Sequence, residues 1–176
     1  MRRLLAIFLV LYPLTVFAQA YELEYRYRPY AVVNNRIVAL QKEEGSPVAS
    51  PFSSSKTRIS YQVKGERAAA RFASGATLMF VVQLEKGVDP DDVIKIVRGK
   101  EKGDKRRFSF FLTGQSRSDG YPVAFTIHRI SEDVYEIRLP GRMEKGEYAF
   151  MPMSESSATG GGGVAGLARF VTFGID

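Results

Sequence analysis

The sequence contains no cysteine and no tryptophan, and His128 is its only histidine. Without cysteine the chain forms no disulfide, no thiolate metal site and no thiol-based redox or nucleophilic centre. One histidine cannot supply the two or three imidazole ligands that a catalytic zinc site needs. We therefore expect stability to come from a hydrophobic core, which twelve phenylalanines and nine tyrosines can supply.

The first twenty residues have the three parts of a secretory signal peptide. Arg2 and Arg3 are positively charged, an apolar run follows over residues 4–17, and Ala18-Gln19-Ala20 is a small-x-small cleavage pattern. A membrane anchor is the competing interpretation, but it needs about 20 apolar residues and this run is shorter. We predict a signal peptide over 1–20, cleavage after Ala20, and a periplasmic or secreted mature chain without a transmembrane segment.

The mature chain is only mildly basic. The formal charge is +6 and becomes +4 when Arg2 and Arg3 are removed. This balance favours solubility and a weak attraction to anionic surfaces, and it is too small to indicate nucleic acid. Export also argues against a nucleic-acid partner.

Residues 21–176 are predicted to form a single all-β domain. Short runs of β-branched and aromatic residues alternate with polar ones and are separated by Gly, Pro, Asp and Ser, and no window has a sustained helical stripe. Their spacing near ten residues favours an immunoglobulin-like two-sheet β-sandwich. The run at 78–84, apolar on both faces, predicts a strand inside a sheet. The expected strands are 21–27, 36–41, 59–64, 68–72, 78–84, 93–98, 106–112, 123–128, 134–139, 147–151 and 169–173.

One local pattern is typical of a corner in a Greek-key sandwich. Met143 is followed by a turn that contains Gly146, and Tyr148 then opens a strand. A tyrosine at such a corner covers the edge of the core, and its hydroxyl bonds to backbone upstream. We therefore expect structural roles for Gly146 and Tyr148.

Part of the chain resembles a group of exported bacterial β-sandwich proteins of uncharacterised function. The resemblance covers Gly65 to Asp176 and depends on GERAAARFASGATLMFVVQLEKGVDPDDVIKI, KRRFSF, DVYEIRLPGRMEKGEYAF and FVTFGID. It implies an immunoglobulin-like fold and brings no activity, ligand or catalytic residue. Tyr21 to Lys64 lies outside it, as an added strand pair or a partner-facing arm.

No residue pattern indicates catalysis. His128, alone at the end of an apolar run, is expected to be structural, and no G-x-S-x-G sequence supplies a serine for a triad. Ser53-Ser54-Ser55-Lys56 matches S-x-x-K, but it lies in a Ser- and Pro-rich connection without a helical pattern or a following K-T-G. We expect no catalytic residues and no enzyme activity.

Two further segments are weak candidates for ligand binding. Asp89, Asp91 and Asp92 could offer carboxylates to calcium, but their spacing differs from the calcium loop and a turn is favoured. Gly160 to Gly163 lacks the G-K-[ST] of a phosphate loop and is interpreted as a connection. We expect no metal and no cofactor, and whether the aspartates bind an ion is left open.

A dense group of cations is the strongest functional candidate. Gly99 and Gly103 mark a turn region between two expected strands, and only Glu101 and Asp104 oppose the basic residues there. Such a hairpin tip would present a cationic surface to an anionic polymer or headgroup, whereas the simpler interpretation is a soluble hairpin whose charges prevent edge pairing. The candidate binding residues are Arg98, Lys100, Lys102, Lys105, Arg106 and Arg107.

These observations favour a non-catalytic exported module that binds a surface, polymer or protein of the envelope. The alternative is a structural or assembly accessory that pairs an edge strand with a protein partner. A small hydrolase is disfavoured by the residue inventory. Fold alone does not choose between these functions.

Overall fold

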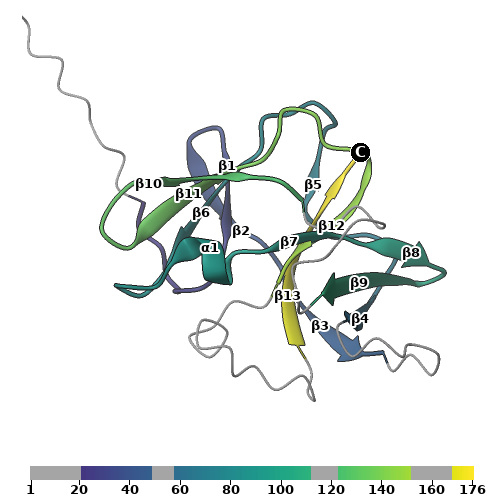
Figure 1. The fold of residues 1–176 in the computed structure, drawn as a ribbon. Coiled ribbons are helices and arrows are strands. Elements are labelled where there is room, and N and C mark those ends of the chain that lie inside the picture. Colours follow the sequence, from purple (N-terminus) through teal and green to yellow (C-terminus); the bar gives the residue numbers. More distant parts are fainter. Residues whose placement is uncertain (1–20, 49–57, 112–122, 152–167) are drawn as a thin grey trace, which may run out of the picture.

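A computed structural model describes residues 21–48, 58–111, 123–151 and 168–176 (Figure 1). The predicted signal peptide at 1–20, the S-x-x-K match at 53–56 and the glycine run at 160–163 lie outside the described residues. Within the described part of the chain, no helix is long and apolar enough to span a membrane.

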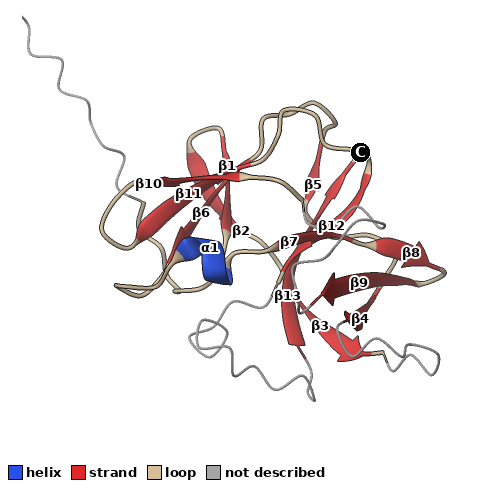
Figure 2. Cartoon of the chain, viewed as in Figure 1, coloured by secondary structure: helices blue, strands red, loops and turns tan. Residues whose placement is uncertain are grey.

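The described chain is all-β, with strands in two sheets and one single-turn helix, α1 (Pro90–Val93) (Figure 2). The smaller sheet has five antiparallel strands, and its central strand β6 contains most of the apolar run at 78–84. In spatial order the strands are β10 (Thr126–Arg129), β11 (Val134–Arg138), β6 (Met79–Gln83), β1 (Tyr30–Val33) and β2 (Arg36–Ala39).

The larger sheet curls nearly into a barrel, on the right in Figure 1. Its spatial order is β7 (Ile96–Arg98), β12 (Gly146–Phe150), β13 (Ala168–Ile175), β3 (Lys42–Pro47), β4 (Arg58–Lys64), β9 (Lys105–Phe111) and β8 (Lys100–Lys102), and β5 (Arg71–Phe72) pairs with β13 in parallel. The strands at the two ends of this order, β7 and β8, are consecutive in the chain. Because β7 pairs with β12 and β8 with β9, the sheet closes on itself.

Gly99 is the point at which the closing strand changes partner. Its backbone N–H donates to the carbonyl of Glu147 (2.7 Å), and a Cβ there would lie 2.7 Å from the ring of Phe108. The absence of a side chain lets the strand pass over that ring. The sequence suggested that Gly99 is part of the turn, but Gly99 lies between β7 and β8 instead. The turn is at Gly103 and Asp104, where Gly103 has φ +59°.

The molecule has two apolar cores. The main core lies between the sheets and includes Phe80, Phe150 and Phe173, whose ring centroids are 5.0 to 5.9 Å apart. The second core lies inside the curled sheet and contains Tyr61, Val63, Val97, Phe108, Ala149 and Phe170. Strands β12 and β13 lie between the cores, because successive side chains point to opposite faces.

Four strand predictions need correction, and the smallest concerns 123–128, where the strand begins only at Thr126. Residues 21–27 form bends and a turn, with Tyr27 at φ +56°, and of 68–72 only Arg71–Phe72 is a strand. The Ala68 N–H donates to the Glu147 carboxylate instead of to a strand neighbour. The first part of 93–98 belongs to α1 and the chain that follows it.

The aspartates at 89–92 begin the helix α1. Asp89 is its N-cap, and its carboxylate accepts a hydrogen bond from the Asp91 N–H (2.9 Å). Such capping satisfies a backbone donor that the helix itself leaves unpaired. Helix capping thus gives the Asp89 carboxylate a structural role.

Candidate functional site

The predicted basic hairpin is present as β8 and β9 (Figure 1). Its register pairs Lys100 with Arg107, Glu101 with Arg106, and Lys102 with Lys105. Residues paired across antiparallel strands point to the same side, and neighbours along a strand point to opposite sides. The six candidate cations are therefore divided between different environments.

Arg106 faces the inside of the curled sheet and is completely buried. Its Nη2 donates to Glu43 (2.7 Å) and to the Lys64 carbonyl (3.0 Å), and its Nε donates to the Gly65 carbonyl (2.9 Å). Its Nη1 contacts the Glu147 carboxylate at 3.4 Å. The expectation that Arg106 belongs to an exposed cationic surface is wrong, because closure of the sheet encloses this face of β9.

Glu147 is the anionic centre of the same buried network. It is 1% exposed, and it accepts hydrogen bonds from Arg71 and from the Ala68 N–H (2.7 Å) in addition to its contact with Arg106. Arg71 also pairs with Asp176 (2.6 Å). These bonds, first to Asp176 and then to Glu147, raise the Arg71 pKa, and the bond from Arg71 lowers the Asp176 pKa.

Arg98 lies on β7, outside the hairpin, and binds to the corner that precedes β12. It forms an ion pair with Glu144 and donates from Nη2 to the Lys145 carbonyl (2.7 Å). The Tyr148 hydroxyl donates to the Glu144 carbonyl (2.6 Å), which is the upstream backbone contact expected of a corner tyrosine. Burial raises the Tyr148 pKa, so the hydroxyl keeps the proton that it donates. Gly146 has φ +149°, which favours glycine at this position.

The remaining four cations share the outer side of the hairpin. Lys102 and Lys105 are opposite each other, and the β4–β9 register places Lys64 beside Lys105. Lys100 lies opposite Arg107 in the neighbouring row. We call Lys64, Lys100, Lys102, Lys105 and Arg107 the basic outer face.

Four of the five cations of the basic outer face have little internal compensation. Among the described residues, no ion pair joins Lys64, Lys102, Lys105 or Arg107 to a carboxylate, and the Arg107 Nε is buried without a hydrogen-bond partner. Lys64 could not be assigned to this face from the sequence, because it is distant in the chain and reaches the face only through strand pairing. The alternation of apolar and polar residues over 59–64 indicates a strand, but it does not indicate which strand lies beside it.

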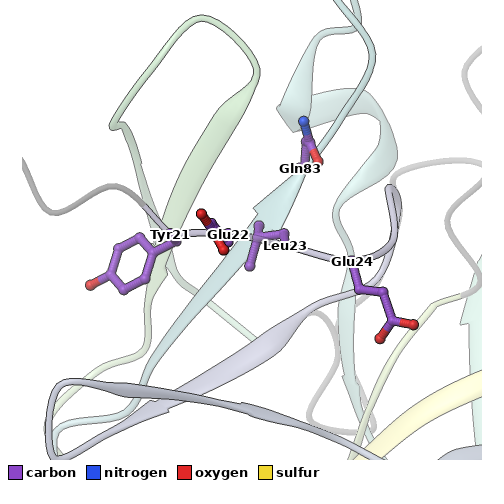
Figure 3. A pocket seen from close by; sticks show the side chains of 5 residues that line it. All are labelled: Tyr21, Glu22, Leu23, Glu24 and Gln83. Atoms are coloured by element: carbon purple, nitrogen blue, oxygen red, sulfur yellow. The ribbon is translucent and has the colours of Figure 1, made fainter.

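Other candidate sites are poorly developed. A shallow hollow lies beside the first described residues and is lined by Tyr21, Glu22, Leu23, Glu24 and Gln83 (Figure 3). The carboxylates of Glu22 and Glu24 point in different directions, so they do not converge on a common ligand. His128 is exposed on the edge strand β10, and no group of three or more potential metal-ligating side chains occurs in the described ranges.

Comparison with protein-family models, curated proteins and solved structures finds no match to this chain.

Proposed function

We propose that this protein is a non-catalytic exported module that binds an anionic polymer or surface through the basic outer face. The observation that carries the proposal is the cross-strand row of Lys64, Lys105 and Lys102. Like charges directly opposite each other destabilise a sheet, so such a row works against folding. An anionic ligand across the strands would relieve this repulsion.

The two sides of the hairpin differ in charge compensation, which supports anion binding by the outer side and a structural role for the inner side. Arg106 has its carboxylates inside the protein, whereas Lys102 and Lys105 have none among the described residues. Lys102 is exposed and Lys105 is half-buried, and surface cations of this kind attract polyanions through a field that salt screens. Immunoglobulin-like topology and export to the periplasm or medium are parts of the same proposal.

A vesicle and polymer binding experiment tests the proposal. Lys64, Lys102 and Lys105 are changed together to Gln, and the control changes Lys86, Arg142 and Lys145 to Gln, which removes the same charge elsewhere. Wild type and control should co-sediment with acidic vesicles or bind lipopolysaccharide at low salt, and the outer-face variant should not. Equal binding by the two variants, or no binding by the wild type, would overturn the proposal.

An assembly role is the second candidate because the smaller sheet has an open edge. Strand β2 pairs only with β1 among the described strands, and its own Val38 is 46% exposed. Edge strands of this type can pair with a partner strand. If this role holds, Val38→Lys should abolish capture of a specific envelope protein, and the outer-face variant should retain it.

A further inference from the structure

A second group of cations lies where the chain passes from the smaller to the larger sheet. Arg28 precedes β1, Lys42 opens β3, and Arg169 lies near the start of β13. The β3–β13 register pairs Lys42 with Val171 and Glu44 with Arg169, so Lys42 and Arg169 lie on the same side of two neighbouring strands. This side is opposite to that of Glu43 and Phe170, which face the interior of the curled sheet.

Arg28 is held in a fixed position beside this pair. Its Nη2 donates to the Leu40 carbonyl (2.9 Å), and its guanidinium carbon lies 5.6 Å from the ring centroids of both Tyr25 and Tyr30. The Tyr30 hydroxyl accepts a hydrogen bond from the Tyr25 N–H (3.1 Å), which fixes the Tyr30 ring relative to the backbone that precedes Arg28. Arg28 is therefore oriented before any ligand arrives.

The three cations are close enough to affect one another. Partial desolvation of the amine, although Lys42 as a whole is exposed, and then the charges of Arg28 and Arg169 lower the pKa of Lys42. In the described part of the chain, neither Arg28 nor Lys42 has a carboxylate partner, and the Arg28 Nε is buried without an acceptor. Arg169 has only an exposed contact of 3.6 Å with Glu44.

We propose that Arg28, Lys42 and Arg169 form a binding site for a single phosphate or sulfate group, with the exposed ring of Tyr25 at its edge. A tetrahedral oxyanion offers several acceptor oxygens to converging N–H donors, and charge-assisted hydrogen bonds of this kind are the strong ones. Arginine and lysine are the side chains that recognise such groups. The group can be a free ion or an ester whose remaining part contacts Tyr25, which is 48% exposed.

Arginine side-chain NMR gives a direct test, since a buried Nε–H exchanges slowly with water. Arg28, Arg71 and Arg107 each have a buried Nε without a partner among the described residues. The folded mature protein is titrated with inorganic phosphate and, separately, with phenyl phosphate. We expect a saturable shift of the Arg28 signal and none of the Arg71 signal, and tighter binding of phenyl phosphate would identify an ester as the ligand.

The matched variant is Lys42→Gln, because Lys42 is exposed and its loss should leave the fold intact. It should weaken phosphate binding at Arg28 at least about tenfold, the effect of one lost charge-assisted hydrogen bond. Phosphate should also raise the Tm of the wild type more than that of the variant. A linear, unsaturated response at Arg28, or equal affinity in the variant, would overturn this site.

The result is separable from the proposed function. The variant of Lys64, Lys102 and Lys105 should keep the response of Arg28, whereas Arg107 reports on the basic outer face. A response of Arg107 alone would leave polymer binding standing and remove the site at Arg28.

Discussion

The two interiors of this protein are built differently. The main core between the sheets is apolar and contains interlocking phenylalanine rings such as Phe80 and Phe150. The interior of the curled sheet joins a small apolar layer to a fully buried ionic network around Arg106 and Glu147. Strand β12 borders both, because Tyr148 and Phe150 face the main core while Glu147 and Ala149 face the curled sheet.

The two interiors make different contributions to the fold. Apolar packing stabilises by area and tolerates rearrangement, whereas buried ions are costly unless each one has its partners. The network joins β3, β5, β9 and β12 through hydrogen bonds that exist only when the sheet is curled. We therefore expect the ionic network to fix the closure of the larger sheet.

Removing Arg106 should have the largest effect. Arg106→Met leaves the largely buried Glu43 carboxylate without its cation and takes one of two cations from the buried Glu147, whose pair with Arg71 remains. This should cost about 3–5 kcal/mol of the free energy of unfolding. Denaturant melts would measure it. Adding Glu43→Gln should restore part of the loss, since the carboxylate that lost its cation is then gone, and Glu147 is kept because it also pairs with Arg71. A cost under about 1 kcal/mol for the single change would contradict the role of the network.

Gly99→Ala tests the closing strand itself. The new Cβ would lie 2.7 Å from the Phe108 ring, so Phe108 or the backbone must move. We expect a loss of about 1–3 kcal/mol, the usual range for overpacking. Gly141→Ala is the control, since a Cβ there meets nothing within 4 Å. Equal unfolding midpoints for these two variants would show that Gly99 has no special role.

Tyr148→Phe tests the rim of the main core with a smaller change. It removes the hydroxyl that donates to the Glu144 carbonyl but keeps the ring stacked on Phe173. The expected cost is about 1 kcal/mol, the contribution of one hydrogen bond. An unchanged midpoint in urea would remove the corner assignment of Tyr148.

The smallest stability effect concerns Asp176. Because the bond from Arg71 lowers the Asp176 pKa below its ordinary value of 3.8, this pair stabilises the fold at neutral pH and loses its effect as pH falls below that value. Unfolding curves between about pH 6 and pH 2 should show a slightly steeper acid loss in the wild type than in Asp176→Asn. A steeper acid loss of stability in Asp176→Asn than in the wild type would contradict a stabilising Arg71–Asp176 pair.

The sequence predicted the all-β class because alternation with period two depends on local geometry alone. It did not predict which polar residues lie inside. Glu147 and Thr172 stand next to aromatic or apolar residues in their strands, and Arg106 stands in the basic run Lys105-Arg106-Arg107. Both patterns are usually found on a solvent-facing side, but curling of the sheet turns these three side chains inward. The basic hairpin is confirmed only over Lys100 to Arg107, because Arg98 lies on β7 and pairs with β12. Its division into an inner and an outer face depends on strand pairing, which local sequence does not reveal.

We propose that the outer side of β9 binds anions, whereas its inner side keeps the larger sheet curled. The most direct measurement is the salt concentration at which single variants elute from an immobilised sulfated polysaccharide. Lys105→Gln should elute at clearly lower salt than the wild type. Lys86→Gln, which removes an equal charge from a residue paired with Glu132, should elute with the wild type. Equal shifts for both variants, or failure of the wild type to bind, would contradict the account.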